Sequence, residues 1–173
     1  YTELLERAVR SIKRGELPDV DGTAARGAEV ELHAPALIPE DYLPDVHTRL
    51  TLYKRISSAR DAEALRELQV EMIDRFGLLP EPAKLLFATA ELKLAATGLG
   101  IAKIDIGAGG GRVKFVEKPS VDPMAIIRLV QGQPKQYRMD GPDTLRLALE
   151  LPEAAERLQA ARGLLALLAP AGR

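Results

Sequence analysis

The chain has 173 residues, of which 46% are hydrophobic and 28% charged, enough apolar sequence for a single globular domain over residues 1–173. Its formal net charge is −1, so no global charge draws it toward nucleic acid or an anionic membrane, although a local patch still could. It has no cysteine, which excludes disulfides and thiolate chemistry and fits a reducing compartment. No apolar run approaches the roughly 20 residues that span a bilayer, so we expect no membrane segment and no signal peptide.

The first third of the chain predicts a helix, a loop and a strand. Residues 1–15 have the apolar spacing of one helical face, and Tyr1 already belongs to it, so we expect a segment of a longer protein. Residues 15–28 are rich in turn formers and predict a mobile loop. Residues 29–39, "EVELHAPALIP", alternate and then reach prolines, which indicates an edge strand followed by extended chain.

Three helices are expected next, over residues 45–57, 61–76 and 81–97. Asp61 is the predicted N-cap of the second helix, and Gly77 is expected to end it in a left-handed conformation. In the first of these helices, the residues expected to face inward are Val46, Leu50, Tyr53 and Ile56.

The apolar period then changes to two. Residues 101–118 predict a hairpin around a glycine tip, residues 122–133 a short helix, residues 136–151 a hairpin that turns at "DGPD", and residues 152–169 a last helix. The resulting order is α-β-α-α-α-β-β-α-β-β-α. Because helices and hairpins are segregated along the chain, we predict an α+β fold with helices packed on a small, mostly antiparallel sheet.

The residue types of known catalytic and metal sites do not gather in recognisable patterns. The glycines of residues 107–113 lack the lysine and hydroxyl of a phosphate-binding loop and lie between two strands. His33 and His47 have no partner at metal-ligand or triad spacing, and "DVDG" at 19–22 lacks the later ligands of a calcium loop. We therefore expect no catalytic, cofactor-binding or metal-binding residues.

The helix over residues 61–76 separates into two faces when its residues are placed 100° apart. One stripe is apolar and must face the core: Leu65, Leu68, Met72 and Phe76. The opposite side is acidic: Glu63, Glu67, Glu71 and Asp74. Arg75 can pair with Glu71 at i, i+4 spacing. Three interpretations stay open: a solvated surface, a docking site for a basic surface, and, least favoured, a carboxylate pair for catalysis.

The predicted first helix carries a second candidate patch, formed by Arg7, Arg10, Lys13 and Arg14. Four cations could contact phosphates, which would make the chain an auxiliary nucleic-acid-binding module. Glu3 and Glu6 share the helix, however, so a solvated helix face is the alternative.

Four stretches together resemble a known family: "YTELLERAV", "ALIPEDYLPDVHTRLTLYKRI", "ELQVEMIDRFGLLPEPAKLLF" and "QYRMDGPDTLRL". On these motifs, which match in order over nearly the whole length, the chain is identified as a member of the C-terminal (TRCF) domains of bacterial transcription-repair coupling factors (Mfd). The resemblance implies a cytoplasmic parent protein with a superfamily 2 ATPase motor, which uses ATP and Mg²⁺ to translocate on DNA. Such parents displace stalled RNA polymerase and recruit the excision-repair protein UvrA.

For the C-terminal domain itself, the resemblance implies a regulatory and non-catalytic role. This domain is expected to pack on the N-terminal UvrB-like module of the same protein and to mask its UvrA-binding surface. The family's contact residues resemble Glu71, Asp74 and Arg75 in "EMIDRFG", and the helical projection adds Glu67. Phe76 and Gly77 are expected to be structural, as a core anchor and a helix stop.

Overall fold

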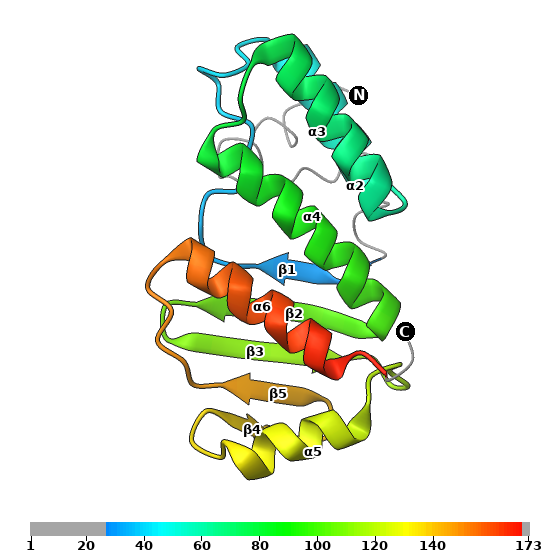
Figure 1. Cartoon of the computed structure of the whole chain (residues 1–173), viewed down its shortest axis with the longest axis vertical. Helices are drawn as coiled ribbons and strands as arrows, with labels where there is room; N and C mark the ends of the chain where they lie inside the picture. Colours follow the sequence, from blue (N-terminus) through cyan, green and yellow to red (C-terminus); the bar gives the residue numbers. More distant parts are fainter. Residues whose placement is uncertain (1–26, 171–173) are drawn as a thin grey trace, which may run out of the picture. The chain divides into compact units, whose positions relative to one another are not determined.

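The computed structural model describes residues 27–170 (Figure 1). Its elements in chain order are β1 (Glu29–Glu31), α2 (Val46–Ser57), α3 (Ala62–Phe76), α4 (Glu81–Leu99), β2 (Ile101–Gly107), β3 (Gly110–Phe115), α5 (Pro123–Gly132), β4 (Tyr137–Met139), β5 (Thr144–Leu147) and α6 (Ala154–Leu168). The predicted α+β class and order are confirmed over this range. The predicted first helix and residues 15–26 of the loop lie outside the described residues. No helix in the described range is long and apolar enough to cross a bilayer.

The described chain forms two compact units. The helical unit comprises residues 35–91, and the sheet unit comprises residues 27–34 together with 92–170. Helix α4 contributes its first part to the helical unit and its last part to the sheet unit.

The helical unit is built on two capped helices. The Asp45 side chain accepts a hydrogen bond from the Thr48 amide at the start of α2, and Asp61 accepts one from the Ala64 amide at the start of α3. Such N-cap bonds satisfy backbone donors that a helix start leaves unpaired. The core of this unit includes Leu52, Tyr53, Ile56, Leu65, Leu68, Met72, Leu86 and Phe87, all buried.

Two predicted inward residues of α2 are wrong in detail. Tyr53 and Ile56 are buried, but Val46 is 40% exposed and Leu50 is only partly covered. The buried face instead takes in Arg49, whose Nη1 donates to the carbonyls of Leu43 and Pro44. These carbonyls precede the helix, and the hydrogen bonds to them offset part of the cost of burying the guanidinium on this side of α2.

The end of α3 also differs from the prediction. Gly77 has a φ of 98°, as a glycine stop requires, but its ψ of −176° is extended and not that of a left-handed helix. Phe76 is half-buried and not a core residue. Its ring meets the ring of Tyr42 edge-on at 6.2 Å, and the guanidinium of Arg75 lies 4.8 Å from its centroid.

The sheet unit contains a five-stranded sheet in the order β1-β2-β3-β5-β4 over the described residues (Figure 1). β1 runs parallel to β2 and occupies an edge, as predicted, while all other pairs are antiparallel. Both predicted hairpins are confirmed. At the first tip, Gly110 has a φ of 108°, and a Cβ on Gly111 would lie 1.8 Å from the Asp105 carbonyl oxygen. Only glycine fits such an approach.

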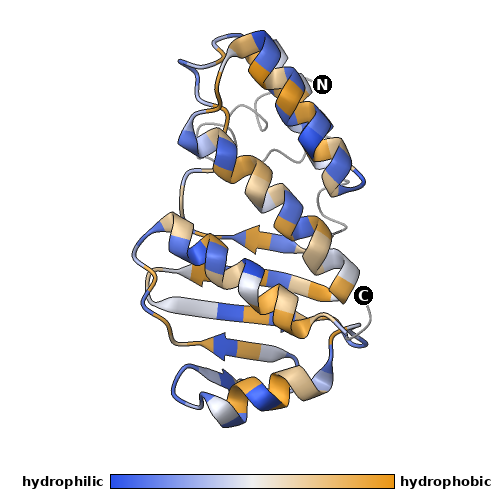
Figure 2. Cartoon of the chain, in the orientation of Figure 1, coloured by the Kyte–Doolittle hydropathy of each residue, from blue (hydrophilic) through white to orange (hydrophobic). Residues whose placement is uncertain are grey.

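One face of the sheet is apolar and covered. Alternate residues such as Ile104, Val113 and Leu145 are buried, and Leu164 and Leu168 of α6 belong to the same core. Figure 2 shows the alternation of apolar and polar residues along these strands. The other face carries the polar residues of the same strands, as expected for an antiparallel sheet with one solvated side.

Candidate interaction site on helix α3

The two faces predicted for α3 exist. Leu65, Leu68 and Met72 are buried in the helical unit, whereas Glu63, Glu67 and Asp74 on the opposite side are exposed. Glu71 is intermediate, with 38% of its side chain accessible. The acidic face therefore divides into carboxylates with arginine partners and carboxylates that face solvent.

Glu71 is the most firmly held of these carboxylates. Arg55 of α2 binds it in a bidentate manner, with Nη1 2.6 Å from Oε2 and Nη2 2.9 Å from Oε1. Arg75 approaches Oε2 at 3.5 Å, which confirms the predicted i, i+4 pair. The hydrogen bonds from Arg55, and the positive charge of both arginines, lower the pKa of Glu71 and keep it ionised. In turn, the Glu71 carboxylate raises the pKa of Arg55.

Arg55 is a residue that sequence reasoning missed. It lies 16 residues before Glu71, on a different helix, so neither helical spacing nor a local motif joins the two. The sequence did contain one indication. Only a few residues connect the predicted helices 45–57 and 61–76, and a short connection makes two helices antiparallel neighbours whose facing side chains can form ion pairs. Glu71 and Arg55 thus fasten α3 to α2.

Glu67 and Asp74 differ from Glu71 because they have no partner in residues 27–170. Within the described part of the chain, neither side chain makes a hydrogen bond or an ion pair. Glu63 is paired with Arg66 on the same helix, at 2.8 Å. Asp74 and Glu67 are therefore the acids of this face that remain available to cations of a partner.

Exposed apolar side chains, which the residue pattern of α3 was not expected to place there, accompany Glu67 and Asp74. Val70 is 58% exposed, and it follows Glu67 by three residues and precedes Asp74 by four, so the three lie together on the solvent face. Beyond the helix end, Leu78 is 84% exposed. The sequence feature that could have revealed this exposed apolar group is the position of Val70 outside the apolar stripe that faces the core. An exposed apolar centre with a charged rim is the composition of a protein interface.

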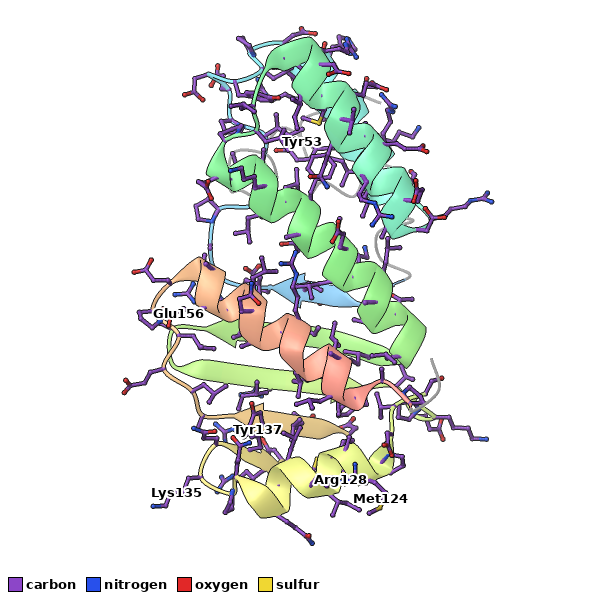
Figure 3. All side chains as sticks on the ribbon, in the orientation of Figure 1. Tyr53, Met124, Arg128, Lys135, Tyr137 and Glu156 are labelled. Atoms are coloured by element: carbon purple, nitrogen blue, oxygen red, sulfur yellow. The ribbon has the colours of Figure 1, made fainter. Side chains whose placement is uncertain are left out.

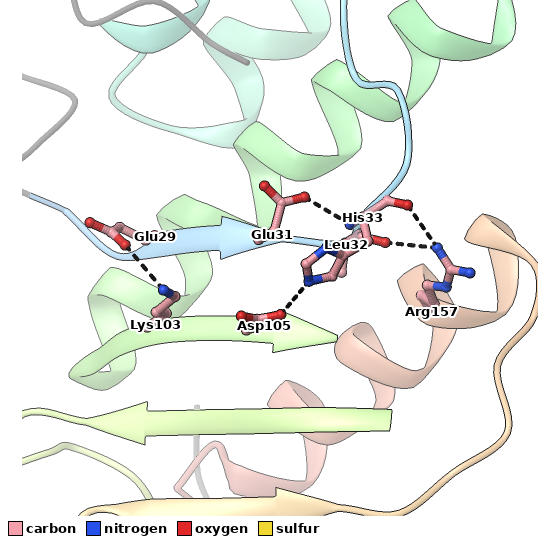
Figure 4. A network of polar contacts seen from close by, with 7 residues as sticks. All are labelled: Glu29, Glu31, Leu32, His33, Lys103, Asp105 and Arg157. Atoms are coloured by element: carbon pink, nitrogen blue, oxygen red, sulfur yellow. Dashed lines mark hydrogen bonds and ion pairs between the residues drawn. The ribbon is translucent and has the colours of Figure 1, made fainter. Parts of the chain in front are cut away.

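The two histidines do not assemble a catalytic centre within residues 27–170. His47 is exposed at the start of α2. His33 has a partner that its sequence position did not reveal, since its Nε2 lies 2.5 Å from Oδ1 of Asp105 on β2 (Figure 4). No hydroxyl side chain bonds His33 in the described range, and no group of three or more His, Asp or Glu side chains there could hold a metal ion.

The second predicted patch, Arg7, Arg10, Lys13 and Arg14, lies outside the described residues. Its contact with nucleic acid therefore stays a prediction.

The comparisons with known proteins agree with these motifs. The sequence profile of the family described as "TRCF domain" matches residues 32–126. The chain is 46% identical over 159 residues to the transcription-repair-coupling factor of Escherichia coli (strain K12), which covers 92% of this chain. It is 43% identical over 159 residues to the factor of the same name from Haemophilus influenzae, again covering 92%. The chain spans only 14% of the length of each of these two relatives.

A solved structure shares the fold. The crystal structure of the C-terminal domain of a transcription-repair coupling factor superposes with a TM-score of 0.68 and 19% sequence identity, and the match covers 82% of this chain and 94% of that one.

Proposed function

This chain belongs to the TRCF domain family, and from that premise we propose that it is a regulatory docking domain of a coupling factor. In this proposal it is not an enzyme itself. It closes over the UvrB-like module of its own parent protein and masks the surface to which UvrA binds. The parent supplies the ATP-driven translocation on DNA, the contact with stalled RNA polymerase and the repair role that the name of its relatives denotes.

One observation carries the proposal: α3 presents two carboxylates, Glu67 and Asp74, on either side of the exposed Val70, and neither has a partner among the described residues. The proposed contact surface comprises these three residues with Glu71 and Arg75. Like charges on one helix face destabilise it slightly, so the arrangement gains stability when a basic partner covers it.

Because Glu71 is paired and Glu67 and Asp74 have no partner among the described residues, this surface contains residues that fix its geometry and residues that are available to a partner. Because Arg55 and Arg75 hold Glu71, this acid fixes the position of the helix face, and Arg75 offers its remaining donors to a partner. Glu67 and Asp74 then supply the free negative charge. Single exposed pairs contribute only about 0–1 kcal/mol, but docking within one chain raises the effective concentration of the partner surface.

A clamp of this strength suits a switch. An effector shifts a closed state toward an open one only by the difference in its affinity for the two. The free energy that holds a small, mostly polar interface closed is low enough for polymerase or DNA binding to overcome it. A large apolar interface would be too stable to open in this way.

The test uses the full-length coupling factor with Glu67→Lys and Asp74→Lys combined. We expect basal UvrA binding and basal ATPase activity to rise about fivefold or more, since two attractive contacts become repulsive. Glu71 is left unchanged, because a lysine there would meet Arg55 and Arg75 and disturb the packing of α3 on α2.

The matched control makes the same charge change in the sheet unit, with Glu117→Lys and Glu150→Lys, both at exposed positions. This variant should stay as repressed as the wild type. The docking role of the α3 face is wrong if the α3 variant also stays repressed, or if both variants are activated equally.

A further inference from the structure

A basic pocket lies at the glycine tip of the sheet, away from α3 in sequence and in the other compact unit. It has a volume of about 670 Å³. Its lining includes the glycine segment 109–111 and four cationic side chains, Arg112, Lys135, Arg138 and Arg146. No acidic residue is among the described residues that line it. The chain as a whole has a net charge of −1, so this concentration of positive charge is a local feature.

Three of the cations form a row across three neighbouring strands. Arg112 on β3 is in register with Arg146 on β5, and Arg146 is in register with Arg138 on β4. Residues in register point to the same face of a sheet, and strands lie about 4.8 Å apart. Like charges directly opposite each other repel and destabilise the pairing. The row therefore weakens the isolated sheet unless an anion binds to it.

These arginines form no ion pair in the described part of the chain. All three are exposed, and no ion pair or side-chain hydrogen bond involves any of them there. The residue opposite Arg112 on β2 is Asp105, whose carboxylate makes no ion pair with Arg112. Asp105 instead bonds His33 Nε2 at 2.5 Å (Figure 4).

The rest of the lining indicates what kind of anion fits. The glycine segment has no side chains, and a Cβ on Gly109 would meet open space, so a ligand can approach the backbone closely. Tyr137, half-buried on β4, and the exposed Lys135 also line the pocket (Figure 3). The remaining lining residues are Pro134, Gln136, Leu147 and Ala148.

Composition separates the two classes of polyanion. None of the exposed large hydrophobic side chains lines the pocket, whereas a protein interface needs an apolar centre. Nucleic-acid interfaces are more polar and far more positive, and arginine forks match phosphate oxygens in a bidentate manner. A nucleic-acid strand fits this surface better than an acidic polypeptide does.

We propose that this basic pocket binds the phosphate backbone of a nucleic acid, with Arg112, Arg146 and Arg138 contacting successive phosphates and Lys135 adding a fourth charge. The site shares no residue with the α3 surface and does not depend on the docking function. It also differs from the predicted patch in the first helix. Because the contacts are to phosphates, binding is insensitive to base sequence and strongly dependent on salt.

The experiment measures fluorescence anisotropy of a labelled 20-nucleotide DNA, single-stranded and as a duplex, with the 173-residue chain at 50 to 200 mM KCl. We expect Arg112→Gln combined with Arg146→Gln to weaken binding at least about tenfold at 50 mM salt. The salt slope should fall by about 0.7 to 0.9 for each arginine removed. Thermal unfolding should show a melting temperature equal to or above that of the wild type, because the variant relieves repulsion.

The matched control is Arg128→Gln, which removes an exposed arginine of α5 outside the pocket (Figure 3). It should bind like the wild type. Failure of the wild-type chain to bind either DNA would overturn the proposal, and so would unchanged binding by the double variant, which would move the contact elsewhere in the chain. If poly-glutamate displaced the labelled DNA as effectively as unlabelled DNA does, the proposal would be wrong about the ligand, which would then be an acidic polypeptide.

Discussion

Within residues 27–170, each compact unit buries one arginine, and the two units satisfy its hydrogen-bond donors to different extents. In the sheet unit, Arg157 of α6 is 8% exposed and donates to four backbone carbonyls, those of Leu32, His33, Leu151 and Pro152 (Figure 4 shows the first two). In the helical unit, Arg49 of α2 is 6% exposed and donates to two, those of Leu43 and Pro44. Its Nε has no hydrogen-bond partner among the described residues.

The difference shows that burial alone does not define the structural role of a charge. Arg157 joins residues that are about 125 positions apart, because it links the end of β1 to α6 and the loop before it. Arg49 closes a turn only five or six residues before itself. A buried charge is tolerated when its donors are satisfied, and it contributes most where its bonds connect distant segments.

The largest expected effect follows from replacing Arg157 with methionine. The change keeps much of the side-chain volume but leaves four carbonyls without their donor, so the free energy of unfolding should fall by about 3 kcal/mol or more. Urea unfolding measures it. Arg162→Met, at an exposed position of the same helix, is the control and should stay within about 0.5 kcal/mol of the wild type.

A smaller effect is expected for Arg49→Met. Two carbonyls lose a donor, but the unpaired Nε is removed with them, so the free energy of unfolding should fall by about 1–2 kcal/mol. Lys54→Met on the exposed side of α2 is the matched control. If Arg49→Met costs as much as Arg157→Met, the number of satisfied donors does not decide the role of a buried arginine, and the comparison fails.

The local parts of this architecture could be predicted from the sequence. The helices, both hairpins and the buried half of α3 follow from apolar periods and from capping and turn residues such as Asp61 and Gly77, which act within a few positions. In the same way, the i, i+4 spacing was enough to predict the Arg75–Glu71 pair.

The parts that could not be predicted depend on how elements pack. The parallel pairing of β1 with β2, the choice of Arg49 over Leu50 for burial, and the Arg55–Glu71 bridge all join segments that no sequence period relates. The arginine row of the sheet is another case. Arg112, Arg138 and Arg146 look like scattered surface charge until the strand order β3-β5-β4 places them side by side.

The smallest expected effect concerns the ion pair between Arg55 and Glu71 in the helical unit. This pair extends the comparison of arginines to a guanidinium that is exposed to solvent. The pKa of Glu71 is lowered from its ordinary value of 4.5, chiefly by the hydrogen bonds from Arg55. A carboxyl whose pKa is lower in the folded state stabilises the fold above its unfolded pKa, and loses that contribution as pH falls through the folded value.

The difference in unfolding free energy between the wild type and Glu71→Gln should therefore be constant above about pH 5 and shrink as the pH falls below about 4.5. Urea unfolding across this range measures it, and the same comparison in an Arg55→Gln background is the control, where the pH dependence should be much weaker because only Arg75 remains. A pH dependence that is unchanged without Arg55 would mean that the bridge does not hold α3 to α2. Because solvent screens this pair, its contribution to stability should stay below that of either buried arginine, although Arg55 makes two hydrogen bonds, as Arg49 does. Burial therefore ranks Arg55 below Arg49, and the number of hydrogen bonds ranks Arg49 below Arg157.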